Sequence, residues 1–260
     1  MFVHSTGTSP SMWKPLTEGL PPGVQALLPV NIGYSPEGPA APAAHEPFRL
    51  EDEVAHLRGL IPGGTTRLHL IGHSYGAAVA LMLAQRAEAE GLAVASLWLY
   101  EPVPFAALRA LPEAELPADV LQQLAALYGP ESPLVDVDHA GQDTWLKAFI
   151  DYWNGPGTWD SVPERVRQGA RSVGLKMFHE VKALSTTAPG FDQLRHSAPM
   201  TLVHGQHTQP PARHMVERLQ RVNPQAHVDV LSGLGHMGVM GAPDAVRQSL
   251  AAHLQRVAPA

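Results

Sequence analysis

The stretch LHLIGHSYGAAVALMLA, residues 68–84, places a serine between two glycines where two different patterns meet. The apolar run at residues 68–72 is typical of a buried strand, and the alanine-rich run at residues 77–84 is typical of a tightly packed helix. Glycine at positions 72 and 76 removes the Cβ atoms that would collide where the chain reverses. The sequence therefore predicts a sharp turn from strand to helix with Ser74 at its tip.

Composition limits the class of protein. The chain has 260 residues, enough for one large domain or for a domain that carries an insertion. Its 18 Lys and Arg against 24 Asp and Glu give a formal net charge of −6, spread along the chain. A mildly acidic surface repels polyanions, so we expect no nucleic-acid partner. The absence of cysteine excludes disulfides, thiolate catalysis and cysteine-ligated metal sites.

The beginning of the chain, MFVHSTGTSP, lacks a basic segment followed by an apolar stretch. No run in the sequence approaches the roughly 18 apolar residues that a membrane span needs. We therefore expect no membrane association, and a cytoplasmic location is the default expectation.

Short apolar runs alternate with helical patterns along most of the chain, which is typical of an α/β protein. The expected strands cover residues 1–4, 25–30, 68–72, 94–101, 200–204 and 227–231. The expected helices cover residues 11–20, 49–60, 75–90, 211–222 and 243–256. We therefore predict a mostly parallel sheet of about six strands, flanked by helices.

Residues 102–198 interrupt this alternation, because they contain no convincing core strand. Their patterns are helical, at residues 119–128, 144–153 and 163–184. Ligands of open α/β sheets bind outside the carboxyl ends of the strands, and a helical insertion between two strands would lie over that edge. We predict a core of residues 1–101 and 199–260, and a helical cap of residues 102–198.

The predicted cap is rich in aromatic side chains, which either form its own small core or face the cleft beneath it. Trp145, Phe149 and Trp153 lie on one predicted helix. We take these three as candidate substrate-binding residues, because rings that face the cleft would make it apolar.

Residues 72–76, GHSYG, match the pattern G-x-S-x-G. This pattern indicates a nucleophile when a strand precedes it and a helix follows, as predicted here; otherwise it is a tight turn with an incidental serine. A hydroxyl needs a base that takes its proton. His236 follows the last predicted strand through a glycine-rich loop, which places it at the same edge of the sheet as Ser74. His236 is therefore the candidate base.

Acyl transfer also needs donors for the negative charge that develops on the carbonyl oxygen. Backbone N–H groups held in turns supply such donors. We expect one from Tyr75, at the start of the helix after the serine, and one from Thr6, in the loop after the first strand.

Four segments match one known family in type and order: HSTGTS at residues 4–9, PVNIGYS at 29–35, GHSYG at 72–76 and GLGHM at 233–237. The chain resembles the α/β-hydrolases over nearly its whole length, although members usually carry His-Gly where this chain has His4-Ser5. The resemblance implies the α/β-hydrolase fold, Ser74 as nucleophile, His236 as general base and acid, and a helical cap at residues 102–198. No cofactor and no metal are expected.

The third member of the catalytic triad departs from the family pattern. Members commonly carry an aspartate three residues after the glycine that follows the penultimate strand, and this chain has Thr208 there. Threonine has no charge to stabilise an imidazolium. Glu101, at the end of the strand that follows the serine's helix, is the preferred acid, and some members take their acid from that strand. The alternatives are a Ser–His dyad oriented by neutral groups, or another carboxylate such as Asp136 or Asp138.

A second departure concerns the beginning of the sheet, where family members usually have two further strands. Their absence would leave the strand expected at residues 25–30 as an edge, and Pro29 is a residue that an edge strand tolerates. Pairing through this edge would produce a homodimer.

The leading hypothesis is a carboxylesterase-like serine hydrolase that cleaves an ester or a related acyl bond of a small, mostly apolar molecule. Thioesterase, lactonase, carbon–carbon bond hydrolase and perhydrolase chemistry use the same residue types, and the sequence does not separate them. The alternative is a ligand-binding or weakly catalytic member of the fold, because the usual acid is absent. A metal site of His204, His207, His214 and His236 is disfavoured by the spacing and by the lack of nearby carboxylates.

Overall fold

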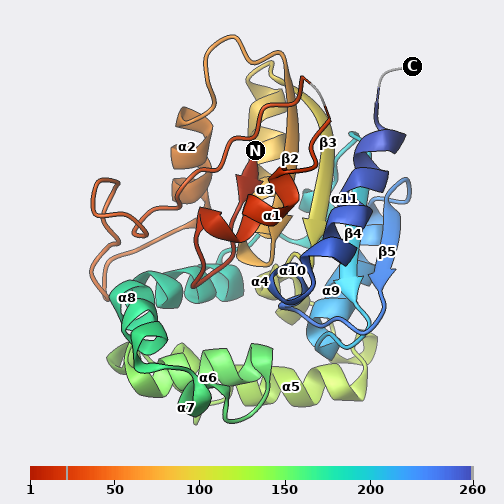
Figure 1. Ribbon diagram of the computed structural model, residues 1–260. Helices are drawn as coiled ribbons and strands as arrows, with labels where there is room; N and C mark the ends of the chain where they lie inside the picture. The colour runs from red at the N-terminus through yellow and green to blue at the C-terminus, as the bar shows by residue number, and fades with distance from the viewer. Residues whose placement is uncertain (22, 259–260) are drawn as a thin grey trace.

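The computed structural model describes residues 1–21 and 23–258. Within them the chain forms a five-stranded sheet in the order β1-β2-β3-β4-β5, and every neighbouring pair is parallel (Figure 1). The strands are β1 (Phe2–Val3), β2 (Arg67–His73), β3 (Ala93–Tyr100), β4 (Met200–Gly205) and β5 (His227–Leu231). The predicted fold class, α/β with a mostly parallel sheet, is confirmed.

Helices flank the sheet and fill the long connection between β3 and β4. They are α1 (Lys14–Thr17), α2 (Leu50–Gly59), α3 (Tyr75–Ala89), α4 (Phe105–Arg109), α5 (Ala118–Tyr128), α6 (Asp143–Asn154), α7 (Thr158–Ser161), α8 (Glu164–Thr186), α9 (Pro210–Val222), α10 (Gly238–Gly241) and α11 (Pro243–Arg256). Among residues 1–21 and 23–258, no helix has the length and apolar content that crossing a bilayer requires.

Alternate residues of the central strands enter two separate cores, as the two-residue period of a strand requires. Leu70 of β2 and Leu97 of β3 pack in one core with side chains of α2 and α3. Ile71 and Trp98, their neighbours in sequence, pack in the other core with side chains of α1 and α11. Both faces of the sheet are therefore covered, which explains why β3 is almost continuously apolar.

The predicted strand at residues 25–30 is wrong. One backbone bond joins this segment to β1, from the Phe2 N–H to the Leu27 carbonyl (2.9 Å). Pro29 has no N–H to continue a ladder, and the Asn31 N–H donates to the His4 ring (3.1 Å) instead of to a carbonyl. The sheet has five strands for this reason, and residues 25–30 form no edge strand. The possible homodimer stays a prediction.

The chain between β3 and β4 forms α4 to α8 and four short 3₁₀ helices, and its described residues contain no strand. Figure 1 shows α5, α6 and α7 beyond the carboxyl ends of β3 and β4. The long helix α8, of 23 residues, leads back and contacts α2 and α3 as well as α4 and α6. We refer to α4 to α8 as the cap helices.

His253 of α11 is buried between two strand hydroxyls. Its Nδ1 lies 2.7 Å from Thr201 Oγ1, and its Nε2 lies 2.8 Å from Ser96 Oγ. Burial lowers the pKa of His253 to about 3, and the positive charge of Arg256 acts in the same direction. The imidazole is therefore neutral in the folded protein at neutral pH.

We predict that the folded protein loses stability as the pH falls below about 6.5, because the unfolded chain then binds protons that buried His253 binds only near pH 3. The contribution of His253 is about 1.4 kcal/mol for each pH unit in this window. Urea unfolding at about pH 7.5, 6 and 5 measures the slope of stability against pH. His253→Gln should reduce the slope, whereas His45→Gln, at an exposed position, should leave it unchanged. An unaltered slope in His253→Gln would contradict the prediction.

Candidate active site

The turn between β2 and α3 holds Ser74 in a backbone conformation that non-glycine residues rarely adopt, with φ 57° and ψ −119°. A Cβ atom at position 72 would lie 2.5 Å from the carbonyl oxygen of Gly76, and one at position 76 would collide with the carbonyl oxygens of Val3 and His4. The Ser74 N–H donates to the Tyr100 carbonyl at 2.8 Å. The predicted strand–turn–helix is present, and β1 and β3 fix it from both sides.

Ser74, His236 and Glu101 form one hydrogen-bonded line. Ser74 Oγ lies 2.9 Å from His236 Nε2, and His236 Nδ1 lies 2.6 Å from Glu101 Oε2. All three side chains are buried. They follow the carboxyl ends of β2, β5 and β3, which parallel strands bring to a single edge of the sheet. The structure thus joins the three residues that the sequence singled out.

Glu101 is the second non-glycine residue with a positive φ, at 45°. Its Oε1 accepts the Gly205 N–H at 2.8 Å, and its Oε2 accepts the hydroxyl of Thr208 at 2.5 Å. Together with His236 these donors compensate a carboxylate that has no exposure to solvent. Asp136, one alternative acid, instead pairs with His139 at 2.7 Å.

Thr208 is a residue whose role sequence reasoning missed. It has no charge, yet its hydroxyl donates to the same carboxylate oxygen that faces His236 Nδ1. The available signal was its position, the third residue after the glycine that ends β4. Thr208 therefore contacts Glu101, and Glu101 in turn contacts His236.

Two further side chains hold the loop that carries His236. The Tyr100 hydroxyl donates to the Gly235 carbonyl at 2.7 Å, and His73 Nε2–H donates to the His236 carbonyl at 2.8 Å. Burial lowers the pKa of His73 well below its usual range, so its ring stays neutral. Trp153 of α6 stacks on the His236 ring, with ring centroids 3.6 Å apart and an angle of 22°. The imidazole is therefore held from the sheet side and covered from the cap side.

The expected oxyanion donors are the backbone N–H groups of Thr6 and Tyr75. Tyr75 follows Ser74 as the first residue of α3, where a helix has N–H groups without an intrahelical acceptor. Thr6 lines the same cavity as Ser74. Within residues 1–21 and 23–258, neither N–H has a hydrogen-bond acceptor. Both remain available to a ligand oxygen.

A cavity opens beside Ser74. Apart from Thr6 and Ser74, its lining comes from the segment between β3 and β4 and carries no charged side chain: Val103, Phe105, Leu127, Tyr128, Leu134, Phe149, Tyr152, Trp153, Val181 and Leu184. The Ser74 hydroxyl therefore faces a mostly apolar cavity that is lined by the cap helices, Val103 and Leu134.

Of the three expected substrate-binding residues, Phe149 and Trp153 line this cavity and Trp145 does not. Trp145 is buried in the cap, stacks on Phe149 with centroids 5.3 Å apart, and donates its indole N–H to the Leu134 carbonyl at 3.4 Å. The reason is distance along α6: Trp145 lies eight residues, about 12 Å of helix, from the Trp153 ring that covers His236.

No three His, Asp or Glu side chains gather as a metal site in the described part of the chain. His204, one of the histidines considered as a ligand, donates through Nδ1 to the Gly205 carbonyl at 3.0 Å.

The model of the alpha/beta hydrolase family matches residues 1–249. The search of curated proteins gave no match.

Similar solved structures include a thermophilic esterase from Thermogutta terrifontis, with 22% identity over 98% of this chain and 89% of that chain, and a TM-score of 0.65. An enol-lactonase from Burkholderia xenovorans LB400 has 16% identity over 98% and 90%, with a TM-score of 0.69. RedJ-thioesterase of the prodiginine pathway in Streptomyces coelicolor has 18% identity over 99% and 89%, with a TM-score of 0.67. At these identities the likenesses show the fold, while the family model covers nearly the whole sequence. The chain belongs to the alpha/beta hydrolase family.

Proposed function

We propose that the protein is a serine hydrolase that cleaves an ester, or a related acyl bond, of a small and mostly apolar substrate through an acyl-enzyme on Ser74. The observation that carries this proposal is the line from Ser74 Oγ to His236 Nε2 (2.9 Å) and from His236 Nδ1 to Glu101 (2.6 Å) beside an apolar cavity. The arrangement supplies a nucleophile, a base and an orienting carboxylate in contact.

The proposed reaction begins when His236 Nε2 takes the proton of Ser74 and Oγ attacks the substrate carbonyl carbon. The carbonyl oxygen becomes negative and accepts the N–H groups of Thr6 and Tyr75. His236 then returns the proton to the leaving alcohol, which departs and leaves the acyl group on Ser74. Water, activated by His236, attacks the acyl carbon, and the acid is released as Oγ regains its proton. Glu101 stabilises the imidazolium in both halves.

The alternative, a ligand-binding or weakly catalytic member of the fold, was based on the missing aspartate at position 208. The contact of Glu101 with His236 weakens that reason. The similar structures are named as an esterase, an enol-lactonase and a thioesterase, which supports acyl chemistry. An ester of an uncharged acyl group is favoured because no charged side chain lines the cavity to meet a second carboxylate.

We predict that Ser74→Ala and His236→Ala each lower the turnover of a p-nitrophenyl ester by about 10⁴–10⁶-fold. A fluorophosphonate probe should add one label to the wild-type protein at Ser74, detected by peptide mass spectrometry, and none to Ser74→Ala. Ser172→Ala, an exposed serine of α8, is the matched control and should keep full rate and labelling. Absence of both labelling and turnover in the wild type would favour the ligand-binding alternative.

Glu101→Gln should lower turnover by about 10²–10⁴-fold, because an amide leaves His236 without the charge that stabilises its protonated form. Thr208→Val keeps the shape of the side chain but removes the hydroxyl from Glu101 Oε2, and should cost about 3–30-fold. Steady-state rates with one ester measure both variants. Equal rates in Glu101→Gln and the wild type would assign the acid to another group.

Leu184→Phe should shorten the acyl chain that the cavity accepts, because Leu184 lines it from α8. We expect kcat/KM for a p-nitrophenyl octanoate to fall by about tenfold relative to the acetate, since each excluded methylene forfeits about 0.8 kcal/mol of burial. Val166→Phe, on an exposed position of the same helix, should leave the ratio unchanged. A ratio that does not move in Leu184→Phe would place the acyl group outside this cavity.

A further inference from the structure

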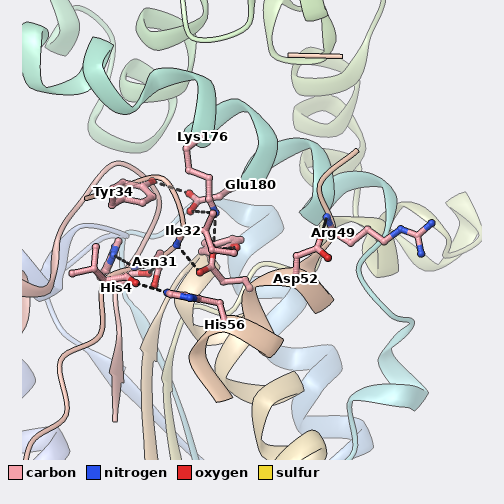
Figure 2. Close-up of polar contacts among 12 residues, drawn as sticks. His4, Asn31, Ile32, Tyr34, Arg49, Asp52, His56, Lys176 and Glu180 are labelled. Atoms are coloured by element: carbon pink, nitrogen blue, oxygen red, sulfur yellow. Dashed lines mark hydrogen bonds and ion pairs between the residues drawn. The ribbon is translucent and has the colours of Figure 1, made fainter. Parts of the chain in front are cut away.

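Three ionisable side chains, Lys176, Glu53 and Glu180, are buried together where α8 meets α2; Figure 2 labels Lys176 and Glu180. Lys176 Nζ of α8 lies 2.6 Å from Glu53 Oε2 of α2 and 3.2 Å from Glu180 Oε1, one turn further along α8. None of the three side chains is exposed to solvent. Burying charge costs free energy that pairing only partly returns, so such a cluster indicates a role beyond stability.

The first link from this cluster to the active site is the Glu53 carboxylate. Its Oε2 accepts the hydroxyl of Tyr75 at 2.9 Å, and its Oε1 accepts the N–H of Ile32 at 2.9 Å. Tyr75 directly follows Ser74, and its own backbone N–H is one of the two proposed oxyanion donors. The side chain of this donor residue is therefore fixed to a buried ion pair.

The second link runs through Tyr34. Its hydroxyl accepts the backbone N–H of Gly7 at 2.8 Å and donates to Glu180 Oε2 at 2.9 Å. Figure 2 shows Tyr34, Glu180 and Lys176 converging from the loop and from α8. Gly7 directly follows Thr6, the other proposed oxyanion donor, and has a φ of +70°. The peptide between Thr6 and Gly7 is thereby oriented by Tyr34.

Both walls of the proposed oxyanion hole thus depend on one buried network, here called the Lys176 network: Glu53, Lys176, Glu180, Tyr34 and Tyr75. We propose that the Lys176 network sets the oxyanion hole, with Tyr34 as the positioning residue on the Thr6 side. The inference rests on the proposed function. It also ties the hole to the cap, because Lys176 and Glu180 belong to α8.

The protonation states agree with these hydrogen bonds. Burial and the neighbouring carboxylates raise the pKa of Tyr34 and of Tyr75 well above their usual range, so both phenols keep the proton that they donate. Burial raises the pKa of Glu180 to about 7, while the Lys176 ammonium opposes the shift. We therefore expect this cluster to accept a neutral group at position 180 that offers an oxygen to the Tyr34 hydroxyl.

The decisive variant is Tyr34→Phe, which deprives the Gly7 N–H of its acceptor and keeps the ring beside His4. Removing an oxyanion donor outright costs about 10²–10³-fold, so loosening one should lower kcat by about 10–100-fold and change KM by less than about threefold. The inhibition constant of a trifluoromethyl ketone, which forms a tetrahedral oxyanion on a serine, should rise by the same factor as kcat falls. A purely structural role would not produce this split.

Two further variants serve as rescue and control. Glu180→Gln retains an oxygen for the Tyr34 hydroxyl and should stay within about threefold of wild-type kcat, whereas Glu180→Leu should change kcat and ketone inhibition in the direction of Tyr34→Phe. Ser249→Ala removes the bond from the Trp98 indole N–H (3.2 Å) in the core on the other face of the sheet. It should lower the melting temperature without altering kcat or ketone inhibition.

The outcomes separate the two proposals. The melting temperature first establishes that Tyr34→Phe is folded. If the wild type hydrolyses the ester and binds the ketone, and Tyr34→Phe does both equally well, the positioning role is overturned and the proposed function stands. If the wild type neither hydrolyses esters nor binds the ketone, both proposals fail. A rise in KM with unchanged kcat in Tyr34→Phe would likewise overturn the positioning role, because it would indicate substrate binding.

Discussion

The positive φ of Ser74 is the constraint on which the rest of the active site depends. Such a conformation costs a non-glycine residue about 1–3 kcal/mol, and it persists only where the surroundings enforce it. Here β1 lies against Gly76 so closely that a Cβ atom would strike its carbonyl oxygens, and β3 accepts the Ser74 N–H. The strain projects the hydroxyl away from the sheet, toward His236 and the cavity.

Glu101 is a second strained residue, and it directly follows β3, the strand beside β2, which precedes Ser74. The two positive φ angles among the described non-glycine residues occur at the ends of β2 and β3, and both direct side chains to the same imidazole. The Glu101 carboxylate has no exposure to solvent, and Gly205, Thr208 and His236 all donate hydrogen bonds to it. The proposed acid, Glu101, thus follows β3, and Thr208, which lies after β4, donates its hydroxyl to the same carboxylate.

The cap helices supply most of the side chains that surround the proposed active site. They line the cavity with apolar side chains, place Trp153 on the His236 ring, and bring Lys176 into contact with Glu53 of the core. A buried ion pair seldom adds stability over an apolar contact of the same size, but its directional bonds favour one arrangement of the groups around it. The proposed oxyanion hole would require such a preference for one arrangement of Thr6 and Tyr75.

The sequence by itself determined the elements whose signals are local. The apolar run and paired glycines around Ser74 predicted the turn, and the position of His236 after the last strand placed it at the correct edge, since parallel strands end together. Glu101 could be preferred on the same argument but not chosen over other carboxylates. The strand predicted at residues 25–30 does not form, because a strand needs hydrogen bonds to a partner strand and Pro29 has no N–H to donate. Only the tertiary structure decided that Thr208 bonds to Glu101, that Trp145 lies inside the cap, and that Tyr34, Glu53 and Lys176 meet, because contacts between residues distant in sequence leave no periodic pattern along the chain.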